Sequence, residues 1–154
     1  MIELSTGIIF LMSSLYGSGY IADNIFDSNQ QASVNEQNSS SVRVLIQSKE
    51  IENYIRQNYS DTPILVEIAR CESTLRQYGK DGDIIRGKVN RNDIGVMQIN
   101  ITYHGENAEK LGYDIYTTEG NIAFGKYLYD KHGSQPWSSS AKCWAKASIE
   151  LAKK

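Results

Sequence analysis

The sequence predicts an α+β protein that is mainly α-helical, with a small irregular β region between helices. Three observations indicate this class. Several stretches carry apolar residues three and four positions apart, which is the spacing of one helix face. The pair Thr62-Pro63 opens the most apolar of these stretches, as an N-cap followed by proline does at a helix start. Residues 78–100 mix Gly, Asp and Asn with short apolar pairs, a pattern typical of turns and short strands.

The chain divides into three expected parts. Residues 1–22 hold an apolar core that is too short to span a bilayer as a helix and has the length of a signal-peptide core. Glu3 stands where a signal peptide carries positive charge, so a signal peptide, an uncleaved anchor and a buried N-terminal segment stay open as alternatives. Residues 23–41 are rich in Asn, Gln and Ser and are expected to form a disordered linker. The folded domain is then expected over residues 42–154.

Helical spacing recurs along the expected domain. The first helix is expected over residues 42–59, where the apolar residues indicate an amphipathic helix, namely Leu45, Ile46, Ile51, Tyr54 and Ile55. The second is expected from Pro63 to about Leu75, and it is apolar nearly all round, so it should be buried. Further helices are expected over residues 108–112, 119–131 and 138–151.

The composition is ordinary for a soluble globular protein, with 40% hydrophobic and 22% charged residues. The formal net charge of −2 provides no basic field, so no nucleic-acid partner is expected. Cys71 and Cys143 show neither CxxC spacing nor a Cys/His cluster, so no metal site and no cofactor are expected. The two cysteines are compatible with one disulfide in an oxidising compartment, and two buried free thiols are the alternative.

Glu72 places a lone carboxylate at the end of the most apolar expected helix. On that helix it falls on the same face as Leu65, Ile68 and Ala69. Burying a carboxyl there disfavours its charged form and raises its pKa, which is how a protein keeps a Glu protonated as a general acid. The alternative is a Glu at a helix end that reaches water or pairs with a neighbouring arginine.

Several motifs extend this observation. The pair Glu72-Ser73 is followed after a loop by "NDIGVMQIN", residues 92–100, and residues 121–128 contain an Asn-Ile, a Gly and a Tyr-Leu in that order. Trp137 and the pair Cys143-Trp144 come last. In this order, from about residue 51 to residue 144, the chain resembles the lysozyme-like superfamily. It is most similar there to soluble lytic transglycosylases, in particular the small enzymes of secretion systems and phages.

The resemblance implies a lysozyme-like fold, in which a helical domain and a small β-rich lobe flank a cleft. It also implies that Glu72 is the catalytic acid and base. Asp93 stands where animal-type lysozymes carry their second carboxylate. It either assists catalysis or only caps a turn or bonds Asn90 or Asn92. The remaining residues expected to bind the glycan or support the cleft are Ser73, Gln98, Asn100, Tyr127 and Trp137.

One departure from the family pattern concerns the residue that orients the Glu. Many transglycosylases carry an Ala-Tyr-Asn-Ala-Gly stretch whose tyrosine helps orient it, whereas this chain has "GSQPWSSSAKCW" at residues 133–144. That tyrosine therefore has no counterpart here. Tyr127 and Tyr103 are candidate substitutes, and core packing is the alternative for both.

The function implied by the resemblance is cleavage of the β-1,4 bond between N-acetylmuramic acid and N-acetylglucosamine in peptidoglycan, with 1,6-anhydro-muramic acid ends as products. The alternatives are a hydrolytic muramidase assisted by Asp93 and a glycan-binding module that has lost catalysis. The expected partner is the glycan strand, in a monomer that serves a secretion system or a phage. Export to the periplasm, the cell wall or the exterior is expected, without an integral span beyond an N-terminal anchor.

Overall fold

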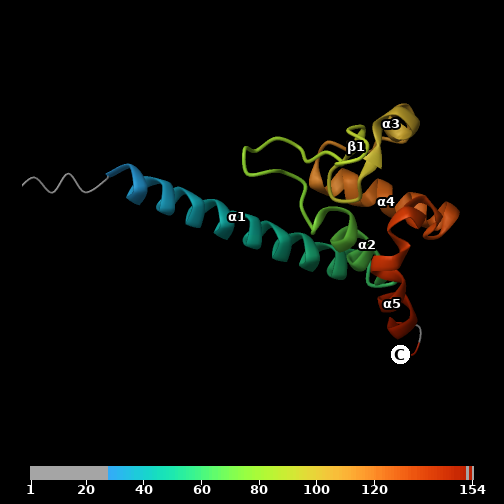
Figure 1. Cartoon of the computed structure of the whole chain (residues 1–154). Coiled ribbons are helices and arrows are strands. Elements are labelled where there is room, and N and C mark those ends of the chain that lie inside the picture. Colours follow the sequence, from blue (N-terminus) through green and yellow to red (C-terminus); the bar gives the residue numbers. More distant parts are fainter. Residues whose placement is uncertain (1–27, 152, 154) are drawn as a thin grey trace, which may run out of the picture.

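The computed structural model describes residues 28–151 and residue 153. Over these residues the protein is mainly helical and has one small two-stranded sheet, which confirms the α+β, mainly α class. Figure 1 shows a long helix, α1, extending away from a group formed by the shorter helices and the sheet. The expected signal peptide or anchor over residues 1–22 lies outside the described residues.

Helix α1 (Ser28–Asn58) is longer than the sequence predicted. The prediction of a disordered linker is wrong for residues 28–41, which lie within this helix, and residues 23–27 lie outside the described residues. The segment 28–41 contains neither Gly nor Pro. Because adding a residue to an existing helix is far easier than nucleating one, the helix expected to begin at Val42 continues toward the N-terminus despite the polar composition.

The C-terminal half of α1 docks on the rest of the protein. Ile51 and Ile55 are buried there. The side-chain oxygen of Gln47 accepts hydrogen bonds from the backbone N–H groups of Gln77 and Tyr78, at 2.9 and 3.2 Å. The helix thus supports the chain segment that leaves α2.

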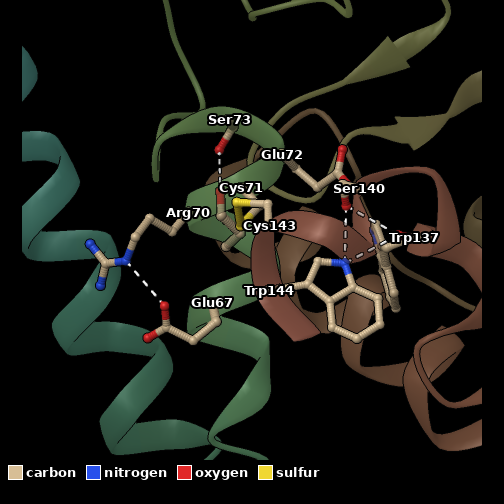
Figure 2. The surroundings of a disulfide bond; sticks show 10 residues. Glu67, Arg70, Cys71, Glu72, Ser73, Trp137, Ser140, Cys143 and Trp144 are labelled. Carbon is tan, nitrogen blue, oxygen red and sulfur yellow. Dashed lines mark hydrogen bonds and ion pairs between the residues drawn. A yellow bond between two sulfur atoms is a disulfide. The ribbon is translucent and has the colours of Figure 1, made fainter. Parts of the chain in front are cut away.

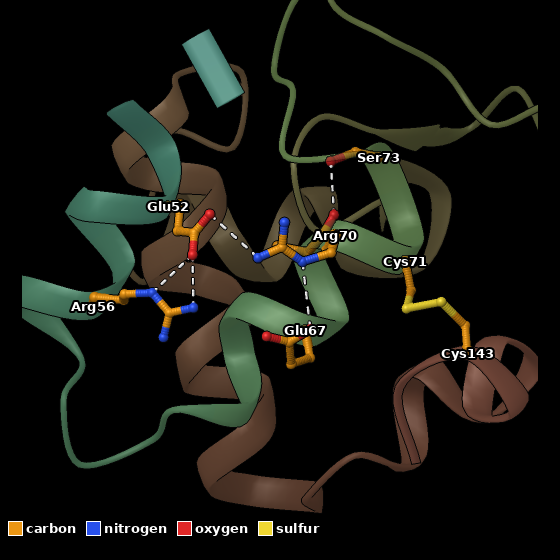
Figure 3. A network of polar contacts seen from close by, with 8 residues as sticks. Glu52, Arg56, Glu67, Arg70, Cys71, Ser73 and Cys143 are labelled. Atoms are coloured by element: carbon orange, nitrogen blue, oxygen red, sulfur yellow. Dashed lines mark hydrogen bonds and ion pairs between the residues drawn. A yellow bond between two sulfur atoms is a disulfide. The ribbon is translucent and has the colours of Figure 1, made fainter. Parts of the chain in front are cut away.

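A surface ion-pair network also joins α1 to α2 (Figure 3). Arg70 contacts Glu52 of α1 at 3.2 Å and Glu67 of its own helix at 3.4 Å. Arg56 hydrogen-bonds Glu52, and this bond lowers the pKa of the Glu52 carboxyl. Since exposed ion pairs contribute about 0–1 kcal/mol each, the buried apolar residues dominate this docking.

Helix α2 (Ile64–Ser73) lies at the centre of the molecule, and its Ile64, Leu65, Val66, Ile68 and Ala69 are buried, as predicted. It begins one residue later than expected, and no side chain caps it. It also ends earlier, because Thr74 and Leu75 both adopt a φ of 56°. Their N–H groups bond back to Arg70 and Ala69 at 3.0 and 3.3 Å, which closes the helix end.

The region after α2 contains the predicted turns and short strands. Strand β1 (Asp93–Ile94) pairs antiparallel with β2 (Ile99–Asn100), with Asp93 opposite Asn100. Helix α3 (Ile101–Lys110) follows directly, so the expected short helix over 108–112 is misplaced. The physical reason is the Asn100 side chain, which accepts bonds from the second and third N–H groups of the helix and starts it there.

The remaining helices follow the predicted pattern closely. Helix α4 (Thr118–His132) matches the range expected over 119–131 within one residue at each end. The range expected as one helix over 138–151 consists of two parts, a 3₁₀ helix η1 (Gln135–Ser140) and then α5 (Ala141–Leu151). Trp137 has non-helical backbone angles inside η1, which puts a kink before α5.

A disulfide joins Cys71 of α2 to Cys143 of α5, with the two Cα atoms 6.0 Å apart. The predicted disulfide is therefore confirmed, and the alternative of free thiols is excluded. None of the helices in the described part of the chain is long and apolar enough to cross a membrane.

Candidate active site

A cleft of about 1010 Å³ runs between the helices and the β region. Its wall includes the end of α2, the loop over residues 79–91, both strands, α3, the end of α4 and η1. The volume is at the upper limit of small-molecule sites, so it suits an extended ligand. The lining carries both acidic and basic side chains, with Glu72 and Asp93 among the acidic ones.

Glu72 lies on the wall of this cleft, partly buried, in the last turn of α2. Burial raises the pKa of its carboxyl, a hydrogen bond from Ser140 opposes this rise, and the negative charge of Asp93 adds to it. The carboxyl therefore stays protonated to a higher pH than an ordinary Glu. This is the state that the sequence predicted for an acid on an apolar helix face.

Ser140 is the residue that touches the Glu72 carboxyl (Figure 2). Its Oγ donates to Glu72 Oε1 at 2.5 Å. The indole Nε1 of Trp144 donates to Ser140 Oγ at 3.0 Å, and the Trp137 carbonyl lies 3.1 Å from the same Oγ. Residues from α2, η1 and α5 thus meet in one hydrogen-bonded group at the cleft.

Asp93 lines the same cleft from β1. Its Oδ1 accepts a hydrogen bond from Asn100 Nδ2 at 2.6 Å and a longer one from Asn90 Nδ2 at 3.4 Å. The structure therefore brings Asp93 and Glu72 to one cleft. It also shows Asp93 bonded to Asn90, as the alternative for this residue proposed, and more closely to Asn100 on the paired strand β2.

Asn100 has two structural tasks. Its Oδ1 caps α3 and its Nδ2 holds Asp93, so both ends of its amide have partners within the protein. Gln98 also lines the cleft, and its Nε2 donates to the Gly95 carbonyl at 2.8 Å. Both residues were predicted to bind glycan. Both line the cleft, and their hydrogen bonds also shape the β1–β2 turn.

Two fully buried side-chain amides hydrogen-bond to the backbone of the β1–β2 turn. Gln77 accepts a hydrogen bond from the Val96 N–H at 2.9 Å, and Asn121 of α4 accepts one from the Met97 N–H at 2.8 Å. Gln77 also donates to the carbonyls of Ile115 and Tyr116, and Asn121 donates to the carbonyl of Ile115. Since unpaired buried polar groups are expensive, these bonds determine where the cleft wall lies.

Glycine is required at two places in this packing. Gly95 has a φ of +70°, and a Cβ there would lie 2.4 Å from Gln77 Oε1 and 2.6 Å from Asn121 Nδ2. A Cβ on Gly125 of α4 would lie 2.7 Å from Met97 Cγ. The Gly and Met of "GVMQIN" and the Gly of α4 are therefore parts of one packed contact.

Two other predicted site residues have roles that the structure makes plain. Ser73 is buried at the end of α2, where its Oγ donates to the Ala69 carbonyl and accepts from the Arg76 N–H. Trp137 borders the cleft but is only 3% exposed, and its Nε1 donates to the Met97 carbonyl at 2.9 Å. Both side chains support the cleft wall, and neither offers much surface to a ligand.

Tyr127 is not brought to the cleft. It stacks on Phe124 with the ring centroids 5.6 Å apart and also contacts Tyr113. The prediction that Tyr127 binds substrate is therefore not supported by its position, and core packing, the alternative, describes it. Tyr103, the other candidate, lines the cleft and is strongly exposed.

Sequence reasoning missed Gln77 and Ser140. Gln77 is one of several polar residues near the end of the expected helix, and Ser140 is the last of three consecutive serines. Neither residue belongs to a recognisable pattern. His104 and His132 also line the cleft. Burial lowers the pKa of His104, and the charge of His132 lowers it further.

Within the part of the chain that the structure describes, no group of three or more His, Cys, Asp or Glu is placed to hold a metal ion.

Comparisons with family models, with curated proteins and with solved structures found no match to this chain.

Proposed function

We propose that this chain is a lytic transglycosylase with a lysozyme-like fold, which cleaves peptidoglycan and uses Glu72 as general acid and base. The observation that carries the proposal is the position of Glu72. It is a partly buried carboxyl on the wall of a large cleft, and burial raises its pKa. Such a carboxyl stays protonated closer to neutral pH, which is what protonation of a glycosidic oxygen requires.

The proposed reaction has two steps. Glu72 donates its proton to the oxygen that links N-acetylmuramic acid to N-acetylglucosamine, and the bond between that oxygen and the muramic acid C1 breaks. The Glu72 carboxylate then takes the proton of the muramic acid C6 hydroxyl, whose oxygen forms the new bond to C1. Glu72 ends protonated, no water is consumed, and the product carries a 1,6-anhydro end.

Asp93 supports this chemistry electrostatically. Its negative charge raises the pKa of Glu72, and a carboxylate on the same cleft can stabilise positive charge that develops on the sugar ring. A disulfide suits an oxidising compartment, so we propose that the protein acts outside the cytoplasm, on the cell wall.

The test is to incubate the full chain with purified peptidoglycan and to identify the soluble products by mass spectrometry. We expect muropeptides with anhydro-muramic acid ends, lighter by one water than hydrolysis products. Glu72→Gln should lower the rate by at least about 10²–10⁴-fold, because one acid/base group contributes that much. Glu67→Gln is the matched control, since Glu67 lies on the same helix but pairs with Arg70 at the surface.

Two other results would replace this proposal. Reducing muramic acid ends would indicate a hydrolytic muramidase in which Asp93 assists the attack of water. Binding to sacculi without any product would indicate a glycan-binding module. Equal rates for the parent and Glu72→Gln would reject Glu72 as the acid.

A further inference from the structure

Ser140 is a half-buried serine that meets a carboxyl from a distant part of the sequence. It belongs to the last residues of η1, and its Oγ lies 2.5 Å from Glu72 Oε1 although the two residues are 68 positions apart in the sequence. Two more groups lie within hydrogen-bond distance of the same Oγ, namely Trp144 Nε1 at 3.0 Å and the Trp137 carbonyl at 3.1 Å. The hydroxyl is thus surrounded by a donor, an acceptor and the carboxyl.

This set of partners satisfies the hydroxyl in both states of Glu72. A serine hydroxyl has one proton to donate and two lone pairs to accept with. When Glu72 is ionised, Ser140 donates to the carboxylate and accepts from Trp144. When Glu72 is protonated, Ser140 accepts from both Glu72 and Trp144 and donates to the Trp137 carbonyl. No heavy atom has to move between the two arrangements.

We propose that Ser140 is a positioning residue that holds the Glu72 carboxyl in one place while it changes between acid and base. Its part in turnover rests on the proposed function, but the contact itself does not. Ser140 would thereby do what an orienting tyrosine does in many transglycosylases, from a segment whose sequence has no such tyrosine.

Hydrogen bonds and the disulfide fix the position of Ser140. The Trp144 indole also donates to the Trp137 carbonyl at 3.1 Å, and the Trp137 indole is tied to the Met97 carbonyl at 2.9 Å. Three residues after Ser140, Cys143 is bonded to Cys71, the neighbour of Glu72 (Figure 2). Serine and carboxyl are therefore fixed to each other through two separate connections.

Other charged groups share the cleft and have to be considered in any titration of Glu72. Asp93 on β1 acts directly on its pKa. Other charged or titratable residues also line this cleft, namely Arg76, His104, His132 and, from the loop over 79–91, Asp81, Asp83, Arg86, Lys88 and Arg91. All of these groups stay in place in the Ser140 variants, so a difference between variants reports on the hydroxyl.

The experiment measures the pKa of Glu72 by NMR, with ¹³C-labelled carboxyl groups, in the full chain and in four variants, which are Ser140→Ala, Ser140→Thr, Ser138→Ala and Trp144→Phe. In Ser140→Ala the pKa of Glu72 should rise, because the carboxylate loses its hydrogen-bond donor. Ser140→Thr keeps a hydroxyl and should restore the parent value. Ser138→Ala is the matched control, since Ser138 is exposed and does not line the cleft.

The same variants are then assayed on peptidoglycan across pH. In Ser140→Ala we expect kcat to fall by about 10–100-fold with KM nearly unchanged, as for loss of a hydrogen bond to a charged group. The alkaline limb of the profile should move to higher pH together with the pKa of Glu72. Trp144→Phe removes the indole N–H that donates to Ser140 and to the Trp137 carbonyl and leaves the Ser140 hydroxyl in place. It should change kcat and the pKa of Glu72 in the same direction by less, and it replaces Ser140→Ala if that variant fails to fold.

The outcomes separate the two proposals. An unchanged pKa of Glu72 in Ser140→Ala and Trp144→Phe overturns the role of Ser140, whatever the activity. If the pKa of Glu72 rises in Ser140→Ala but the parent protein releases no product, the contact is confirmed and the proposed function is rejected. A raised pKa with an unchanged rate shows that the contact does not position Glu72 for catalysis, and this also overturns the inference.

Discussion

At the scale of single residues, burial of the ionised Glu72 carboxyl lowers the free energy of unfolding. Its pKa is raised in the folded protein, mainly by burial. In the unfolded chain the same carboxyl has its ordinary pKa of about 4.3. Between these two values the folded state binds more protons than the unfolded state, so stability falls as pH rises through this window. Above both values the full effect of burying the charge is present.

We therefore expect Glu72→Gln to be more stable than the parent at neutral pH, with the difference shrinking toward acid pH. The replacement removes the buried charge and keeps the shape of the side chain. The measurement is the free energy of unfolding in urea at several pH values. Glu67→Gln serves as the control, because it removes a partly exposed charge that is paired with Arg70 and should bring no such gain. Parallel pH profiles for the parent and Glu72→Gln would contradict a raised pKa.

At the scale of elements, the β1–β2 turn is the structure on which the cleft depends. Gln77 and Asn121 hold its backbone from behind, and Met97 packs on Gly125 of α4. The close approach of both amides to Gly95 leaves no room for a side chain. The turn is therefore specified by residues that come from three separate parts of the sequence.

We expect Gly95→Ala to destabilise the protein by more than about 1–3 kcal/mol, the usual range for a non-glycine residue at positive φ, because a clash adds to the strain. Gly112→Ala is the matched control. Gly112 has a similar φ of +80°, but no atom lies within 4 Å of the Cβ it would gain. Urea unfolding of both variants isolates the packing contribution at the turn. Equal losses of stability in the two variants would show that Gln77 and Asn121 move away from the new Cβ without destabilising the fold.

At the scale of the whole molecule, the Cys71–Cys143 disulfide connects the central helix to the last one. It closes a loop across a sequence separation of 72 residues, which corresponds to about 4 kcal/mol in the chain-entropy model. Because Cys71 precedes Glu72 and Cys143 lies one helical turn beyond Ser140, the same bond aligns the two partners at the cleft.

Reduction of the disulfide should lower the free energy of unfolding by about 4 kcal/mol. It should also raise the pKa of Glu72, because the donor from Ser140 is then held less firmly. Urea unfolding and the NMR titration, each with and without reductant, measure the two effects. The Cys71→Ser, Cys143→Ser double variant should reproduce both changes and show no further response to reductant. A response in that variant would mean that the reductant acts elsewhere.

The elements were largely predictable from sequence because their signals are local. Apolar spacing located α2 and α4 within one or two residues, and the Gly, Asp and Asn pattern located the β region. The prediction was poorer where the deciding interaction is not periodic. The polar part of α1 follows from continuation of a formed helix, and the start of α3 follows from a single capping side chain, Asn100.

The sequence by itself determined the helical class, the buried face that carries Glu72 and the cysteine pair, because these depend on spacing along one chain segment. Only the tertiary structure decided what surrounds the carboxyl. Ser140 reaches Glu72 across 68 residues, and Tyr127 turns into an aromatic cluster instead of the cleft. Spacing within a segment specifies which residues share a face, whereas the packing of distant segments specifies which faces meet.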